Sequence, residues 1–206
     1  MEVRKYSMKR AALAFVGCVI LLSMTMAAQE TRSELSVQGT GFFTKDSSGN
    51  GIKRNATQTG GLLVGYRYQI TRWLAAEANY GYDRNTQTYF GSTVARVQSN
   101  IHQITGSAVV KLPGFARIQP YALAGGGGLL FDPRGNSGGP SGGATWQARG
   151  AFLYGGGADY AFTKHLSFRA EYRGLVYKAP NFNLASLNTD SWTHTAQPSA
   201  GVVFHF

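Results

Sequence analysis

The sequence is poor in cysteine and in charged residues. Its only cysteine, Cys18, lies close to the N-terminus of the 206-residue chain. Disulfide bonds, zinc–thiolate sites and catalytic cysteines are therefore excluded from the remainder of the protein. Charged residues make up 15% of the chain, against about 25% in an average protein, and together with the high content of glycine and aromatic residues this excludes a coiled coil.

Long apolar runs are also missing from most of the chain. After residue 30 the sequence has no uninterrupted apolar stretch of the about 18 residues that indicate a transmembrane helix. Glycine and aromatic residues are abundant instead, with 27 glycines and an aromatic share of 13%. The hydrophobic share of 43% excludes wholesale disorder, because the chain has enough apolar surface to bury.

The N-terminal segment has the three parts of a secretory signal peptide. Residues 1–10 contain four basic residues and one acid, residues 11–22 are apolar, and small residues follow at Ala27 and Ala28. This pattern predicts a signal peptide over residues 1–28, cleaved near Ala27 or Ala28. A lipoprotein signal ending at Cys18 is the alternative, but the apolar run continues past that cysteine. Cleavage leaves 16 basic and nine acidic residues, a net charge of +7 in place of +10.

From Leu35 onward, apolar and polar residues alternate, which is the period of a β-strand with two different faces. Between Leu166 and Arg173, for example, apolar residues occupy the even positions and polar or charged residues the odd ones. Most of the segments have about ten residues, close to the ~9–11 that a tilted strand needs to cross a bilayer. The eight segments cover residues 35–44, 62–70, 74–82, 103–112, 119–131, 152–162, 166–173 and 196–206.

Short and long connections between these segments alternate along the chain. Three are tight, at residues 71–73, 113–116 and 163–165, and the others are long and polar, at 45–58, 83–99, 132–148 and 178–191. Long loops on one rim and short turns on the other are typical of outer-membrane barrels. We therefore predict an all-β fold over residues 29–206, an eight-stranded antiparallel up-and-down transmembrane β-barrel. Both ends of the barrel domain then face the periplasm.

The alternation does not by itself say which face points inward, since a soluble barrel of the lipocalin type has the same period. Tyrosine and phenylalanine lie near the segment ends on the apolar face, as they do in the aromatic girdles of membrane proteins. The polar face carries charges of both signs, which suits pairing inside a narrow lumen. The predicted lumen charge network consists of Arg67, Glu77, Asp159, Arg169, Glu171 and Arg173. We interpret it as a plug, and a gated ion path is the alternative.

The last strand ends in a pattern of polar, glycine and aromatic residues at Ser199, Gly201, Phe204 and Phe206. It looks like the signal that outer-membrane barrels present to the barrel-assembly machinery, where a strand could add to an exposed sheet edge. The chain here resembles the small outer-membrane barrels of the OmpA-type transmembrane domain and the opacity-protein and Ail-like adhesins. The resemblance covers residues 33–206 and rests on architecture and the terminal signal. Because the chain stops at Phe206, we expect no peptidoglycan-binding domain and no cell-wall tether.

The resemblance implies a structural or surface-interaction role in the outer membrane of a Gram-negative-type bacterium. A narrow ion-conducting barrel and a lipid A-modifying enzyme are the alternatives. His165, Ser167 and Glu171 offer the residue types of a hydrolase. However, His165 falls in a short turn while the other two should point into the lumen, so we predict no enzymatic activity. We also expect no cofactor and no metal site.

The long loops should carry whatever specificity the protein has. Their candidate contact residues are Lys53, Arg54, Tyr89, Phe90 and Trp146. For the three aromatic residues, folding back on the rim is the alternative. Basic loops favour anionic partners, so we expect contacts with outer-membrane lipid, lipopolysaccharide phosphates or an unknown extracellular ligand. We expect no nucleic-acid partner, and a monomer.

The inside-out assignment predicts a simple fractionation result. The mature protein should remain with the outer-membrane fraction, because an apolar outer wall is stable only in lipid or detergent. Its migration on a gel should also change on heating. Recovery in the soluble periplasmic fraction, without heat-modifiable migration, would instead identify a lipocalin-like barrel.

Overall fold

The computed structural model describes residues 32–91, 94–136 and 144–206, and the predicted signal peptide at residues 1–28 lies outside these ranges. Within them, no helix is long and apolar enough to cross a membrane. A short hairpin, β2 (Ser47–Gly49) and β3 (Ile52–Ala56), follows the first long strand, and one short 3-10 helix, η1 (Ala185–Leu187), precedes the last. The long strands are β1 (Ser33–Thr44), β4 (Thr59–Gln69), β5 (Leu74–Phe90), β6 (Val94–Lys111), β7 (Ile118–Asn136), β8 (Gln147–Ala161), β9 (Leu166–Lys178) and β10 (Trp192–His205).

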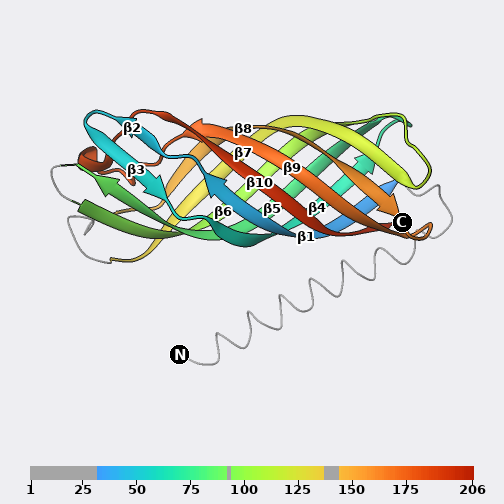
Figure 1. Ribbon diagram of the computed structural model, residues 1–206, viewed down its shortest axis with the longest axis horizontal. Helices are drawn as coiled ribbons and strands as arrows, with labels where there is room; N and C mark the ends of the chain where they lie inside the picture. Colours follow the sequence, from blue (N-terminus) through green and yellow to red (C-terminus); the bar gives the residue numbers. More distant parts are fainter. Residues whose placement is uncertain (1–31, 92–93, 137–143) are drawn as a thin grey trace, which may run out of the picture.

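These eight long strands close into a barrel (Figure 1). Each pairs antiparallel with its neighbour along the chain, and β10 returns to pair with β1. Ser33 and Phe206 complete the closure through two backbone hydrogen bonds of 3.0 and 2.9 Å. The predicted eight-stranded antiparallel up-and-down barrel is therefore confirmed.

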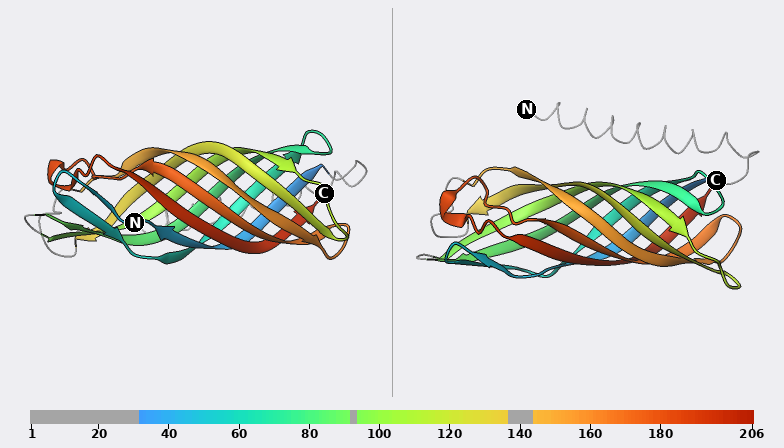
Figure 2. Two further views of the ribbon diagram at one scale, coloured as in Figure 1. Left: turned by 45° about the horizontal axis from the view of Figure 1, so that its top comes forward. Right: turned by 90° about the horizontal axis from the view of Figure 1, so that it is seen from above.

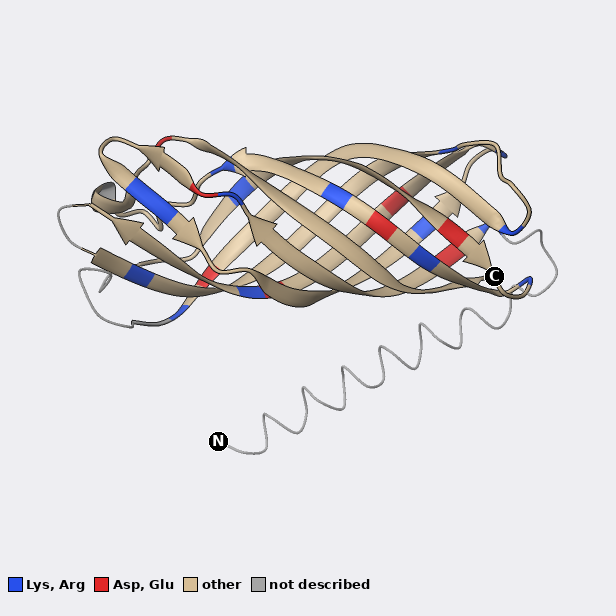
Figure 3. Ribbon diagram, in the orientation of Figure 1, with Lys and Arg blue, Asp and Glu red and all other residues tan. Residues whose placement is uncertain are grey.

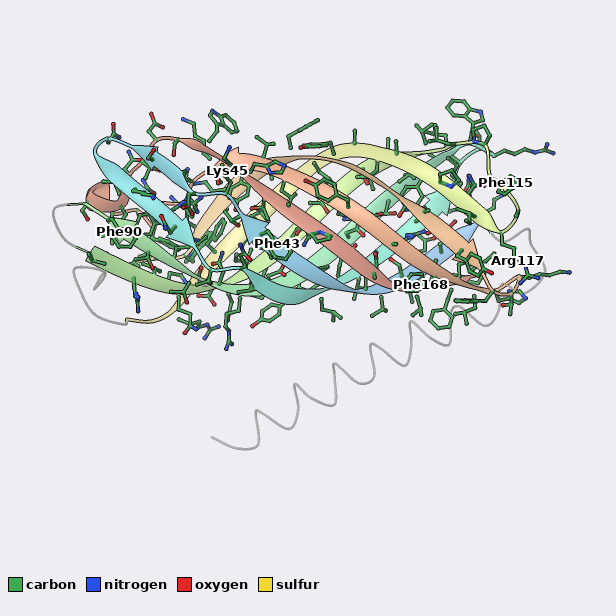
Figure 4. All side chains as sticks on the ribbon, in the orientation of Figure 1. Phe43, Lys45, Phe90, Phe115, Arg117 and Phe168 are labelled. Carbon is green, nitrogen blue, oxygen red and sulfur yellow. The ribbon has the colours of Figure 1, made fainter. Side chains whose placement is uncertain are left out.

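The two faces of the wall differ as the alternation predicts. Large apolar side chains lie on the outside, among them Leu62, Ile104 and Phe152, and Figure 4 shows side chains projecting all around the barrel. Polar and charged side chains, including Gln38, Gln103 and Arg169, are buried on the inside. This arrangement is the reverse of a soluble barrel and suits a lipid environment.

The two ends of the barrel are built differently. At one end, called the short-turn end, the connections at residues 70–73, 112–117 and 162–165 are tight. The C-terminus lies at this end (Figure 2). The other end, called the long-loop end, carries the β2–β3 hairpin, η1 and the far halves of β5 and β6.

The predicted long loop at residues 83–99 is wrong, and the one at 132–148 is wrong at its start, where β7 continues to Asn136. Residues 83–99 are mostly strand, because β5 continues to Phe90 and β6 begins at Val94, and the two pair along their whole length. Both faces of this part of the strand carry mainly polar residues, so the alternation of apolar and polar residues that identifies the other strands is missing here. Asn85 and Gln87 point inward and are buried. The edge of β5 is covered by β3, which pairs with it from Lys53 to Ala56. The long-loop end is therefore a raised sheet and not a set of free loops.

Glycine lets β6 and β7 approach closely. A Cβ atom at Gly127 would lie 2.1 Å from the carbonyl oxygen of Ile104 and 2.6 Å from the Cα of Thr105. A Cβ atom at the adjacent Gly128 would meet nothing within 4 Å. The two positions therefore offer a matched pair of substitutions on the same strand.

We predict that Gly127→Ala destabilises the barrel by about 1–3 kcal/mol, because β7 must move away from β6 to make room. Gly128→Ala should leave stability within about 0.5 kcal/mol. Urea unfolding of the protein in lipid vesicles measures both changes. Equal effects of the two substitutions would contradict the close approach of the two strands.

Candidate functional site

The lumen near the short-turn end contains a network of buried ion pairs, seen in Figure 3 as alternating blue and red strand positions. The strand register places Arg67 opposite Glu77, and Asp159 opposite Arg169. The Nε of Arg67 lies 2.5 Å from Glu77 Oε2, and the Nε of Arg169 lies 2.7 Å from Asp159 Oδ1. The structure thus brings four of the predicted network residues together inside the barrel as two ion pairs.

The remaining two predicted members join these pairs. Arg173 Nη2 lies 2.5 Å from Glu77 Oε1, and its Nε donates to Glu171. Longer contacts cross the lumen, including 3.7 Å between Arg67 Nη2 and Glu171 Oε2. All six predicted residues are therefore buried in one connected cluster.

Sequence analysis missed three members of this cluster, Glu34, Lys111 and Tyr121. Glu34 Oε2 accepts from Arg169 at 2.8 Å and its Oε1 from Lys111 Nζ at 2.9 Å. Glu34 precedes the apolar alternation of β1, but its even position, shared with inward-facing Ser36 and Gln38, is a signal that could have found it. With Glu34 and Lys111 included, four cations face four carboxylates, so the formal charge of the network is zero.

Tyr121, on β7, packs against the network from its own side of the lumen. Its hydroxyl donates to Glu171 Oε2 at 2.6 Å, and the guanidinium of Arg67 lies over its ring, 4.3 Å from the centroid. A cation over an aromatic face is stabilised by the ring quadrupole, most strongly when both groups are desolvated. The glycine-rich and irregular pattern of residues 119–131 concealed this inward-facing tyrosine from sequence analysis.

Uncharged polar residues occupy the middle of the lumen. Gln197 donates to Gln103 Oε1 at 3.1 Å, and Ser199 donates to Gln38 Oε1 at 3.0 Å. These bonds connect side chains across strands that are far apart in the sequence. The polar layer therefore continues the filling of the barrel toward the long-loop end.

Near the long-loop end, the lumen is filled by an apolar cluster that includes Ile101, Leu129 and Phe131. The segment between β9 and β10 contributes Phe182, whose fully buried ring lies edge-on to those of Tyr89 and Phe131. The prediction of a polar loop at 178–191 is therefore wrong in part. Its polar composition hid two buried anchors, Phe182 and Leu187.

Hydrogen bonds hold this segment in place over the barrel mouth. Gln147 Oε1 accepts from the backbone N–H groups of Asn181 and Phe182 at 2.9 and 3.0 Å, and the Tyr89 hydroxyl donates to the carbonyl of Pro180 at 2.7 Å. Phe182 and Asn183 have φ angles of 51° and 61°, a conformation that non-glycine residues rarely adopt. Contacts with the barrel therefore stabilise a backbone shape that the segment would not favour alone.

Two of the candidate loop contacts are corrected by the structure. Arg54 and Tyr89 are each only 1% exposed, so they are not available to an external partner. Arg54 donates to Ser47, Gln87 and Thr193, which ties the β2–β3 hairpin to the barrel. Sequence alone could not show this, because burial here depends on the hairpin folding over the rim. The other three candidates are exposed: Lys53, Phe90 and Trp146.

The terminal pattern lies on β10 beside β1. Ser199 faces the lumen and Phe204 faces outward. A Cβ atom at Gly201 would lie 2.1 Å from the carbonyl oxygen of Val37. The glycine of the pattern is thus needed for the closing strands to approach each other.

The structure does not assemble the rejected hydrolase set. Glu171 is held by Arg173 and Tyr121 in the lumen, whereas His165 lies in the turn and its Nδ1 is 3.2 Å from the carbonyl oxygen of His205. Ser167 faces a different histidine: its Oγ lies 2.8 Å from the Nε2 of His205. Among the described residues, no group of three His, Cys, Asp or Glu could hold a metal ion.

Comparison with known proteins agrees with this architecture. Residues 14–206 match the family described as outer membrane protein beta-barrel domain. The chain is similar in fold to Neisserial surface protein A, with a TM-score of 0.58 and 17% identity, over 84% of this chain and 97% of that chain. The outer membrane protein OprG from Pseudomonas aeruginosa gives 0.60 and 14%, over 86% and 97%. The attachment invasion locus protein Ail of Yersinia pestis gives 0.50 and 15%, over 86% and 100%. No curated protein matches at the sequence level.

We predict that Glu77→Gln lowers the free energy of unfolding by about 3–5 kcal/mol, because it leaves buried Arg67 and Arg173 without their shared carboxylate. Asp132→Asn is the matched control, since Asp132 pairs at 2.8 Å with the largely exposed Arg134. Its effect should stay within about 1 kcal/mol. Urea unfolding in vesicles distinguishes the two, and a negligible effect of Glu77→Gln would contradict a stabilising lumen network.

Proposed function

The chain belongs to the outer membrane β-barrel family and is located in the outer membrane of a Gram-negative bacterium, and from this we propose that it is a surface-interaction protein with a plugged lumen. The long-loop end would face outward and meet anionic groups. The phosphates of lipopolysaccharide are the partner chemistry that we favour. The observation that carries the proposal is the filling of the barrel by its own side chains.

Three successive layers support the plug. Ion pairs lie in the short-turn half together with the apolar side chains of Ala75, Val109 and Leu123, amide and hydroxyl groups lie in the middle, and the part of the apolar cluster that includes Phe182 lies in the long-loop half. An eight-stranded barrel is just wide enough to be filled in this way. Passage through the lumen would require these side chains to rearrange, whereas binding at the rim would not.

The charge balance at the long-loop end supports an anionic partner. Asp132 and Asp190 are already paired with Arg134 and Lys178 at 2.8 and 2.9 Å. Asp46 is exposed beside Lys45 and is the counter-charge that offsets one of the exposed cations. Lys45, Lys53 and Arg96 are exposed there and form no ion pair within the described part of the chain. A net positive rim attracts phosphates over a distance of about 10 Å at moderate ionic strength.

Exposed aromatic residues lie beside two of these cations, and Figure 4 labels Lys45 and Phe90. Lys53 and Phe90 line one surface hollow of about 420 Å³, and Lys45 and Trp192 line another of about 390 Å³. An aromatic ring next to a cation offers both apolar contact and charge, which suits the phosphorylated sugars at the surface of the outer leaflet. Trp146, exposed on the same end, would extend this contact surface.

We further propose that the terminal pattern at Ser199, Gly201, Phe204 and Phe206 is read by the barrel-assembly machinery, and that the barrel works as a monomer. The pairing of β10 with β1, which closes the barrel, supports a sequence in which the pattern is read first and the barrel closes afterwards. Before β1 pairs with it, the free edge of β10 could add to a sheet edge of another protein through backbone hydrogen bonds. The alternating outward aromatics would then identify the strand.

We predict that Lys45→Glu, Lys53→Glu and Arg96→Glu together weaken binding of a phosphorylated lipopolysaccharide core oligosaccharide about tenfold, since each exposed charge contributes up to about 1 kcal/mol. The protein is held in a nanodisc of zwitterionic lipid. The control, Arg72→Glu with Arg117→Glu and Lys164→Glu, makes the same charge change at the short-turn end and should leave affinity within about twofold.

Binding should also weaken as salt rises, and a dephosphorylated core oligosaccharide should bind much less. No binding by the unmodified protein, or an equal loss in both triple variants, would contradict the proposed anionic partner.

A further inference from the structure

We propose that the mouth of the barrel at the short-turn end is an esterase site, in which Ser167 is the nucleophile and His205 the base, acting on small esters that carry a negative charge. The site lies at the opposite end of the barrel from the proposed binding surface. It is therefore independent of the surface-interaction function, and either can fail without the other.

The strand register brings the reacting groups together. Ser167 is at the start of β9 and His205 at the end of β10, with Val203 opposite Ser167. Both residues face inward, and Ser167 Oγ lies 2.8 Å from His205 Nε2. This is the distance at which a histidine can remove the proton of a serine hydroxyl.

A carboxylate lies near the other ring nitrogen. His205 Nδ1 is 3.8 Å from Glu34 Oε1, and β1 pairs Glu34 directly with His205. Lys111 and Arg169 hold this carboxylate in place. Glu34 is thus a positioning residue, placed to stabilise the imidazolium that forms when His205 accepts a proton. Serine next to histidine and histidine next to an acid is the arrangement of known catalytic triads, which also occur on folds unrelated to one another.

A small pocket adjoins the serine and histidine. It has a volume of about 240 Å³ and opens toward the short-turn end, and Ser167 and His205 both line it. This volume is below the about 300–1,000 Å³ of pockets for drug-sized ligands. The acyl group of the substrate must therefore be short.

The charge of the pocket selects the substrate class. Lys111, Arg117 and Lys164 line it, and its one acid, Asp159, is already bound by Arg169 at 2.7 and 2.8 Å. Arg117 and Lys164 form no ion pair within the described part of the chain, and Figure 4 places Arg117 at this end. A carboxylate or phosphate on the substrate would bind to these cations. The same cations would stabilise the oxyanion that forms on the ester carbonyl oxygen during attack.

The reaction balances without a cofactor. Ser167 Oγ attacks the ester carbonyl carbon while its proton passes to His205 Nε2. The bond to the leaving alcohol then breaks, and His205 returns the proton to the alcohol oxygen. Water attacks the acyl-serine in the second half, giving up one proton to His205, which passes it back to Ser167. The products are the alcohol and the carboxylic acid.

The test uses the full barrel refolded in detergent, with its folded fraction measured by heat-modifiable migration. The probes are a short-chain alkyl fluorophosphonate and the 4-nitrophenyl esters of succinate and acetate. We expect one covalent adduct, found on Ser167 by peptide mass spectrometry, and hydrolysis that favours the succinate ester over the acetate ester. Ser167→Ala should abolish the adduct.

His205→Gln keeps a hydrogen-bonding side chain but removes the base, and should slow labelling at least about a hundredfold. Glu34→Gln should lower the maximal labelling rate and leave the half-saturating probe concentration unchanged, which a merely structural role would not produce. Arg117→Glu with Lys164→Glu should raise KM for the succinate ester but not for the acetate ester. His165→Gln and Ser199→Ala are controls that should label at the rate of the unmodified protein.

The opposing explanation is that the Ser167–His205 contact only ties β9 to β10. In that case the folded protein gives no adduct, while Ser167→Ala lowers the stability of the barrel. The absence of an adduct on folded protein, an adduct on another serine, or labelling that is unchanged in His205→Gln would each overturn the proposal.

Discussion

The structure depends on pairing charges inside a closed barrel of eight strands. The outer wall must be apolar to remain in lipid, so the polar residues of every strand are turned into a narrow lumen. A buried charge without a partner would cost several kcal/mol, and breaking a buried pair is strongly destabilising. Arg67, Arg169 and Arg173 avoid that cost because carboxylates from β1, β5, β8 and β9 reach them from several sides. A single neutral network therefore connects strands that the backbone joins only to their neighbours.

The barrel and its inward charges could be predicted from sequence because alternation assigns each side chain to a face. Arg169, Glu171 and Arg173 are a direct example, since their spacing of two residues places all three in the lumen. Alternation does not describe regions where polar residues replace the apolar ones. That is why the far halves of β5 and β6 were predicted as loop, and why Tyr89 and Arg54 were candidate loop contacts. Their burial depends on the β2–β3 hairpin and on Phe182, which come from other parts of the chain.

The contact between Ser167 and His205 at the short-turn end could not be predicted from the sequence either, because it joins two different strands. The residues His165 and Ser167 are close in sequence, but the barrel places Ser167 against His205 from the neighbouring strand. Register between β9, β10 and β1, which no local pattern specifies, decides this contact. The two ends thus differ in kind: the long-loop end exposes cations and aromatic rings on a raised sheet, and the short-turn end holds a small positive pocket. Ion pairs, hydrogen-bonded amide and hydroxyl groups and apolar side chains lie in the lumen between them.

Single-channel recording in planar bilayers tests the central claim, that the lumen is filled from end to end. The account predicts that the folded barrel, inserted from detergent into a bilayer in concentrated potassium chloride, produces no unitary current steps above the baseline. Bilayer insertion is verified independently by recovering folded protein from the membrane. Stable unitary currents that increase in proportion to the salt concentration would contradict the account, because they require a continuous aqueous path past the ion pairs and past Phe182.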